Sequence, residues 1–312
     1  MILVTGATGF VGRGLVAHLR SLGRQVRLAV REGGDPAQNM IAVGEIGPQT
    51  DWVQALDGID SVVHLAGRAH VTARERDALT QFRKVNVDGT RRLVQQADAA
   101  GVRRFVLLSS VKAAADTTDE HALLESDPVN PRTPYGISKL EGEQALWDTA
   151  NRMEPVVLRP PLVYGPGVKA NFRALLRLVD LGVPLPFGAV RNRRSLIARD
   201  NLVSAIAIAL TATGAAEKTF YVTEGPPIST PALIRELGLA LGKPARLVSL
   251  SPALMRAAAA MVGRRETADS LLGSLAINGQ SFRAATGWTP PVTQQDAFKE
   301  VAAWYKQAKG SL

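Results

Sequence analysis

The chain has 312 residues and is 46% apolar, so it can bury a sizeable core as one large domain or as two. It contains no cysteine, which excludes disulfides, thiolate metal sites and thiol nucleophiles. The formal net charge is +9, but the arginines are scattered and aromatic residues make up only 5%. We therefore expect no nucleic-acid partner.

No apolar run approaches the roughly 20 residues that span a bilayer, so we expect no integral membrane segment. The chain opens directly on a strand-like run, without a basic region or a cleavage site. This favours a protein without a signal peptide and, since cysteine is missing, a cytoplasmic one. The four histidines show no metal-ligand spacing, so no metal site is predicted.

Strand-like and helix-like segments alternate along the first half of the chain. Short apolar runs predict strands at residues 1–5, 25–30, 41–46, 61–66, 104–109 and 155–159. Between them, apolar residues at helical spacing predict helices at residues 11–22, 50–56, 79–100 and 135–150. This alternation predicts an α/β protein with a Rossmann-type, doubly wound parallel sheet.

After residue 159 the pattern changes. Helices are predicted at residues 171–181, 200–213, 230–241, 252–262 and 293–306, with a strand at residues 219–222. We predict a dinucleotide-binding domain of residues 1–165 plus about 195–228, and a smaller C-terminal substrate-binding domain of residues 166–194 plus 229–312. The segment 252–262, followed by Arg264 and Arg265, also has the composition of a helix on a membrane surface, although a helix of the substrate domain is favoured.

A glycine-rich turn joins the first strand to the first helix. Residues 5–12 read TGATGFVG, with glycines at 6, 9 and 12. Such glycines allow a tight turn and a close approach of the main chain to a pyrophosphate, which the helix N-terminus attracts. The position of the turn at a strand-to-helix junction predicts a dinucleotide cofactor.

A phenol and an ammonium group share one face of the helix at residues 135–150. Tyr135 and Lys139 are four residues apart, and the pair Ser109–Ser110 ends the fifth strand upstream. A neighbouring ammonium favours the phenolate and lowers the pKa of a tyrosine towards the working range of an acid–base catalyst. By itself this spacing is common on amphipathic helices and does not establish a catalytic role.

The wording TGATGFVG at residues 5–12 and TPYGISKLEGE at residues 133–143 resembles the extended short-chain dehydrogenase/reductase family. That family contains NAD(P)-dependent nucleotide-sugar epimerases, dehydratases and reductases. The resemblance implies that Ser110, rather than Ser109, hydrogen-bonds the substrate oxygen, that Tyr135 exchanges the proton and that Lys139 holds the nicotinamide ribose. One departure is the segment Val111-Lys112-Ala113, where many relatives carry Val-Tyr-Gly.

The resemblance also implies the positions that hold the cofactor. They are Gly6, Thr8, Gly9, Phe10, Val11, Gly12, Arg31, Glu45, Ile46, Ala66, Gly67, Asn86 and Lys139. Arg31 ends the second strand, where an arginine suits the 2′-phosphate of NADP, while the adjacent Glu32 keeps NAD possible. We therefore favour NADP(H) and leave NAD(H) open.

On the substrate side, the resemblance implies a UDP-sugar. Ser110 and Tyr135 would meet the sugar, Asn171 and Phe172 the nucleotide diphosphate, Phe187 the uracil and Arg194 the phosphates. A homodimer through the helices at residues 79–100 and 135–150 is expected at the level of the family.

Three functions are compatible with these residues. The first is a reductase acting at C4 of a UDP-4-keto-6-deoxy-N-acetylhexosamine for surface polysaccharide, favoured because Arg31 suits an exchangeable NADP. The second is a UDP-hexose 4-epimerase, acting on UDP-glucose or UDP-N-acetylglucosamine with the same residues. The third is a non-catalytic NADP-binding scaffold or sensor, which the Tyr135–Lys139 pair disfavours.

Overall fold

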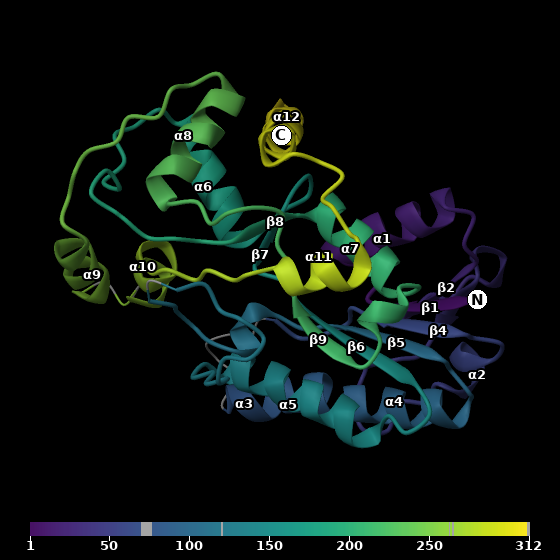
Figure 1. The fold of residues 1–312 in the computed structure, drawn as a ribbon. Coiled ribbons are helices and arrows are strands. Elements are labelled where there is room, and N and C mark those ends of the chain that lie inside the picture. Colours follow the sequence, from purple (N-terminus) through teal and green to yellow (C-terminus); the bar gives the residue numbers. More distant parts are fainter. Residues whose placement is uncertain (70–76, 120, 262, 264, 311–312) are drawn as a thin grey trace.

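Seven short parallel strands form the central sheet of the computed structural model, which describes residues 1–69, 77–119, 121–261, 263 and 265–310 (Figure 1). The strands are β1 Ile2–Thr5, β2 Val26–Val30, β3 Met40–Ala42, β4 Ser61–His64, β5 Arg104–Leu108, β6 Glu154–Arg159 and β9 Lys218–Tyr221. Their order is β3-β2-β1-β4-β5-β6-β9. Strands are added first to one side of β1 and then to the other, so the strand order reverses between β1 and β4. The predicted doubly wound parallel sheet is confirmed.

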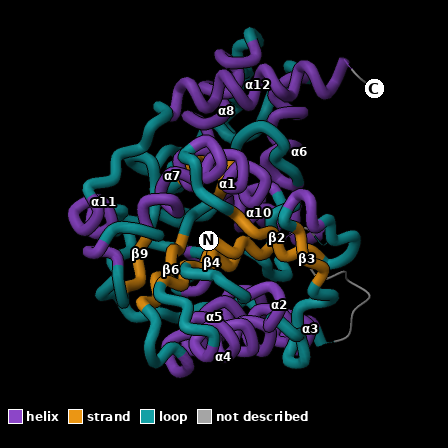
Figure 2. Tube along the Cα trace, turned by 90° about the vertical axis from the view of Figure 1, so that its right-hand side faces the viewer, coloured by secondary structure: helices purple, strands orange, loops and turns teal. Residues whose placement is uncertain are grey.

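One face of the sheet is covered by α1 Phe10–Ser21, α7 Arg199–Ala209 and α11 Gln280–Thr286 (Figure 2). Leucines at helical spacing on α1, among them Leu15 and Leu19, meet Leu202 and Ile206 of α7 above the strands. Phe282 of α11 joins the same core. The predicted domain boundaries stay a prediction.

The opposite face carries α2 Val53–Leu56, α3 Ala78–Arg83, α4 Thr90–Ala99 and α5 Pro134–Thr149. Trp52, Leu93, Phe105 and Leu146 fill the core between these helices and the strands. The single helix predicted at residues 79–100 is wrong in one respect, because a π-helical turn, Lys84–Gly89, separates α3 from α4. That turn carries Asn86.

A second unit stands beyond the carboxyl ends of the strands. It contains a two-stranded parallel sheet of β7 Leu162–Tyr164 and β8 Leu196–Ala198, with α6 Ala170–Asp180, α8 Thr230–Leu241, α9 Pro252–Met261, α10 Arg265–Leu272 and α12 Gln294–Gly310. Tyr164, Leu237 and Phe298 belong to its separate core. Within the described ranges, no helix is both long and apolar enough to cross a bilayer.

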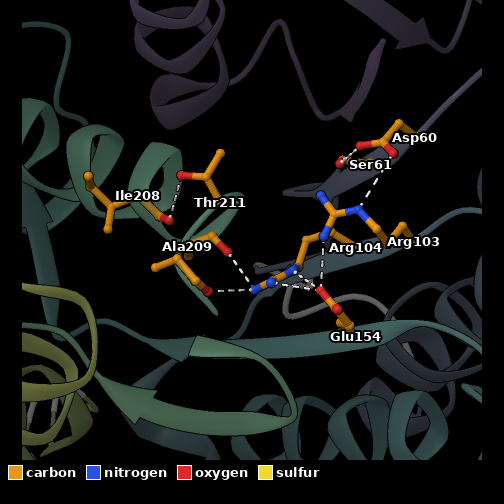
Figure 3. Close-up of polar contacts among 9 residues, drawn as sticks. Asp60, Ser61, Arg103, Arg104, Glu154, Ile208, Ala209 and Thr211 are labelled. Atoms are coloured by element: carbon orange, nitrogen blue, oxygen red, sulfur yellow. Dashed lines mark hydrogen bonds and ion pairs between the residues drawn. The ribbon is translucent and has the colours of Figure 1, made fainter. Parts of the chain in front are cut away.

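At the amino-terminal edge of the sheet, two arginines tie three elements together. Figure 3 shows Arg103 and Arg104 reaching the carboxylate of Glu154, at 3.0 and 2.7 Å. Arg104 is almost completely buried and also donates to the carbonyl of Ala209 at 3.0 Å. These bonds fasten β5 to β6 and to the end of α7, and they lie beside a hollow of about 610 Å³. We assign this cluster a structural role.

Candidate active site

The glycine turn after β1 leaves the main chain bare. Gly6 has a φ of +66°, and a Cβ at Gly12 would lie 2.1 Å from the carbonyl oxygen of Gly6. No side chain caps the first turn of α1, so its N–H groups remain available to an anion. This cradle fits the pyrophosphate of a dinucleotide, and a side chain at Gly12 would force the turn itself apart.

The other predicted cofactor residues of this turn differ in their exposure. Thr8 and Gly9 are exposed, whereas Val11 is half-buried and packs against the core under α1. The ring of Phe10 lies 5.9 Å from the guanidinium of Arg199. The turn therefore presents main chain outward, with Phe10 on the side of the second unit.

The two serines at the end of β5 face different partners. The Ser110 hydroxyl lies beside the phenol of Tyr135, whose pKa it lowers, and accepts from the main-chain N–H of Lys112 at 3.2 Å. Ser109 donates instead to the buried carboxylate of Glu143. Successive residues of an extended chain point to opposite sides, so only one of the two serines can meet Tyr135.

Burial, rather than a neighbouring cation, governs the pKa of Tyr135. Desolvation raises the pKa of the phenol, and the hydrogen bond from Ser110 lowers it only in part. The ammonium of Lys139 donates to the carbonyl of Leu108 at 2.8 Å. Without cofactor, Lys139 therefore does not bring the pKa of Tyr135 towards the working range, and the shift expected beside an oxidised nicotinamide stays a prediction.

Lys139 is itself desolvated. Burial lowers the pKa of its ammonium to about 8, although the carboxylate of Glu143 opposes the shift. A Cβ at Gly67 would lie 3.9 Å from the Lys139 Nζ. The predicted turn at Ala66 and Gly67 and the predicted lysine are thus neighbours, and the lysine still carries its charge at neutral pH.

Asn86 links that turn to the helix of Tyr135. Its side-chain oxygen accepts from the N–H of Arg68 at 2.8 Å, and its amide donates to the Arg68 carbonyl and to the Ser138 hydroxyl, both at 3.0 Å. Ser138 in turn donates to the carbonyl of Tyr135 at 2.8 Å. The structure thereby brings together Asn86, the turn after β4 and the start of α5.

A row of buried, hydrogen-bonded polar side chains behind this turn was not predicted from the sequence. The Thr5 hydroxyl lies 2.7 Å from His64 Nδ1, His64 Nε2 lies 3.1 Å from the Thr90 hydroxyl, and Thr90 donates to the carbonyl of Asn86 at 2.8 Å. Since Thr90 uses its proton on Asn86, the bonding pattern assigns the imidazole proton to Nε2. Burial, with Lys139 nearby, lowers the pKa of His64 to about 3. A histidine inside the apolar run of residues 61–66 was the available signal.

A buried ion pair beneath the site was also missed. Arg159 donates to both carboxylate oxygens of Glu143, at 2.6 and 3.0 Å, and its guanidinium stands 5.7 Å from the ring of Tyr221. Glu143 follows Lys139 by one helical turn, so the spacing of four residues was the signal. The pair fixes Ser109 on one side and thereby the course of the main chain at Ser110.

The residues predicted to meet the adenosine lie apart from this group. Arg31 is exposed at the end of β2 and Glu45 is exposed after β3, whereas Ile46 is half-buried. A Cβ at Gly89 would lie 2.5 Å from Ile46, so Ile46 packs against the π-helical turn. The exposed position of Arg31 is compatible with contact to a cofactor phosphate.

Two of the predicted substrate residues are core residues. Phe172 is 2% exposed and stacks on Tyr164 at 5.2 Å, and Phe187 is 7% exposed in the same core. Apolar packing holds these rings inside, and their contact with a nucleotide stays a prediction.

Asn171 and Arg194 remain on the surface side of the second unit. Asn171 is exposed near the start of α6, and half-buried Arg194 donates to the carbonyl of Gly273 at 3.0 Å. Burial lowers the pKa of Arg194. Among the described residues, the hydrogen bonds and ring contacts of Tyr135 do not extend to Asn171 or Arg194.

Known proteins are similar to this chain in sequence and in fold. The model of the NAD dependent epimerase/dehydratase family matches residues 2–222. A UDP-glucose 4-epimerase of Vibrio cholerae is 38% identical over 322 aligned positions, which cover 98% of this chain and 96% of the relative. A short-chain dehydrogenase/reductase superfamily protein from Agrobacterium tumefaciens with bound NAD is 25% identical at a TM-score of 0.77, covering 100% of this chain and 98% of the other. MoeE5 in complex with UDP-glucuronic acid and NAD, 22% identical, shares the fold at a TM-score of 0.79 over 98% and 99% of the two chains.

Proposed function

Because this chain belongs to the NAD dependent epimerase/dehydratase family, we propose that it is an NAD-dependent 4-epimerase of a UDP-hexose. The observation that carries the proposal is the placement of Ser110 beside the phenol of Tyr135, one helical turn from Lys139, whose ammonium adjoins the turn after β4. The near full-length similarity to a UDP-glucose 4-epimerase supports C4 as the reacting position. The non-catalytic alternative finds no support in these features.

The chain supplies binding and proton transfer. The glycine turn and the N-terminus of α1 would hold the pyrophosphate, and Lys139 the nicotinamide ribose. When bound, NAD supplies the reversible oxidation at C4. Ser110 would hydrogen-bond the C4 oxygen, and Tyr135 would take the proton from it and later return it. In the free protein the phenol stays protonated, because burial raises its pKa and Lys139 is bonded to Leu108.

Replacing Tyr135 by phenylalanine tests this assignment. We expect turnover between UDP-glucose and UDP-galactose to fall by roughly 10²–10⁴-fold, since only the transferable proton is removed. Dinucleotide binding, measured by titration, should be retained. The matched control is Tyr305→Phe, which makes the same change at a buried tyrosine of α12. Undiminished turnover in Tyr135→Phe would refute the assignment.

A reductase is the second candidate, and the exposed arginine after β2 favours it. Arg31 is exposed at the end of β2, where its guanidinium is free to meet the 2′-phosphate of NADP. An NADPH-dependent reduction of a UDP-4-keto-6-deoxy-N-acetylhexosamine for surface polysaccharide would use the same Ser110 and Tyr135. Tightly held NAD that survives dialysis supports the epimerase, whereas net NADPH oxidation with a UDP-4-keto sugar supports the reductase.

We also propose a homodimer through α4 and α5 and a cytoplasmic location, both at the level of the family. Two-fold dimers are the commonest symmetric oligomers, and in such a dimer both copies would use the same face of α4 and α5. Light scattering coupled to size-exclusion chromatography measures the oligomeric state directly. A monomeric mass at micromolar concentration would contradict the dimer.

A further inference from the structure

One helix of the second unit turns apolar side chains outward instead of towards a core. α9 contains no buried residue, and Leu254 and Met261 are 61% and 83% exposed. These two residues are seven apart and share one face of the helix with Ala257 and Ala258. Met255 alone packs on the second core from the other side. Val248 and Leu250, just before the helix, are also exposed.

The sequence segment that contains this helix carries charge of one sign. The 29 residues between Glu236 and Glu266 contain five cations, Lys243, Arg246, Arg256, Arg264 and Arg265, and no acidic residue. Lys243 pairs with Asp180 and Arg256 with Asp269, both on other elements. The segment that contains α9 is therefore apolar and basic in composition, as is typical of a helix that lies on an anionic bilayer.

The connections of α9 place it at the substrate end of the molecule. The segment enters α9 after Leu247 and Ser249, which form β-bridges with Leu185 and Phe187. It returns through α10 to Leu275, which bridges Arg194. Figure 1 shows α9 as an outlying helix, far from α12. A surface that docked α9 would thus lie next to segments predicted to hold the substrate.

We propose that α9 is an interfacial helix, and that its face of Leu254, Ala257, Ala258 and Met261 inserts into the headgroup region of an anionic lipid bilayer. A second copy of the chain is the competing occupant of this face. A two-fold contact would bring this basic segment of one copy against the same segment of the other, which like-charge repulsion disfavours. This proposal does not depend on the reaction that the site catalyses.

Sedimentation with vesicles tests the proposal on the full chain. We expect binding to phosphatidylcholine vesicles that contain phosphatidylglycerol, little binding to phosphatidylcholine alone, and release by high salt. Leu254→Ser combined with Met261→Ser should weaken binding roughly fivefold or more, since binding scales with the apolar area inserted. The matched control is Val53→Ser combined with Leu239→Ser, at residues 69% and 67% exposed on α2 and α8.

Circular dichroism and dinucleotide titration establish that both double variants are folded. Equal vesicle binding by the α9 variant and the wild type would overturn the proposal, as would no binding by the wild type. If the wild type ignores vesicles and the α9 variant changes the mass measured by light scattering, the face belongs to a second copy instead.

Discussion

Adjacent residues at the end of β5 have separate tasks, although their side chains are identical. Ser110 faces the phenol of Tyr135, while Ser109 is bonded to the buried pair of Glu143 and Arg159. A hydrogen-bond donor at a reacting oxygen acts on the rate, whereas a donor to a buried carboxylate acts on stability. The two roles can be separated by the same substitution at each position.

We expect Ser110→Ala to lower kcat by roughly 10²–10³-fold with little loss of stability, as for removal of one donor at a reacting oxygen. Ser109→Ala should keep most of the turnover but lower the melting temperature, because Glu143 loses a buried donor. Steady-state kinetics and thermal unfolding of both variants provide the measurement. The reverse pattern would exchange the roles of the two serines.

Burial of His64 should lower the free energy of unfolding at acidic pH. Its pKa is about 3 in the folded chain and about 6.5 when unfolded, so between these values only the unfolded state binds the proton. Stability therefore falls as the pH drops below 6.5, by about 2 kcal/mol at pH 5. Denaturant unfolding at several pH values measures this slope. His64→Gln should flatten the slope while His18→Gln keeps it; equal slopes in all three proteins would disprove the assignment.

At the scale of elements, the interruption between α3 and α4 is coupled to α5. The π-helical turn Lys84–Gly89 pushes the carbonyl of Asn86 towards α5, where Gly142 offers no side chain. A Cβ at Gly142 would lie only 2.3 Å from that oxygen. π-Turns of this kind often occur at functional sites, and here the turn aims Asn86 at Arg68 and Ser138.

Gly142→Ala should therefore displace the π-helical turn. We expect a loss of about 1–3 kcal/mol in unfolding free energy, as for overpacking of a core, together with weaker dinucleotide binding. Gly225→Ala is the control, since a Cβ there would meet nothing within 4 Å. Unchanged stability and cofactor affinity in Gly142→Ala would show that α5 adjusts without moving Asn86.

At the scale of the whole molecule, one buried carboxylate joins the small sheet to the helices around it. Glu224 accepts hydrogen bonds from the phenol of Tyr164 at 2.8 Å, the N–H of Ala198 at 2.6 Å, Asn201 at 2.8 Å and Gln294 at 3.2 Å. These donors belong to β7, β8, α7 and α12. The position of the small sheet relative to α7 and α12 thus depends on one carboxylate that accepts from four donors.

Glu224→Gln places an NH₂ group where only acceptors are tolerated. We expect a loss of roughly 1.5–3 kcal/mol in unfolding free energy, because at least one buried donor loses its charged acceptor. Glu300→Gln, on the exposed side of α12, should change stability little. Denaturant unfolding compares the two; equal midpoints would mean that a water or a rearranged side chain replaces the lost acceptor.

Local patterns determined much of this protein. Apolar periodicity located most strands and helices, the glycines of residues 5–12 marked the dinucleotide turn, and the spacing of Tyr135 and Lys139 put both on one helical face. Each of these signals lies within a few residues, because element type and side-chain direction repeat with the helix or strand period. The short β7 and β8 gave no such signal, because three residues are too few to show a period.

Tertiary structure alone decided which groups those elements meet. It paired Ser109 with Glu143, joined His64 to Thr5 and Thr90, buried the rings of Phe172 and Phe187, and left α9 uncovered. It also set the direction of the pKa shift of Tyr135, through desolvation that no spacing encodes. Hydrogen bonds, burial and dielectric surroundings join residues far apart in the chain, so they become defined only when the elements pack.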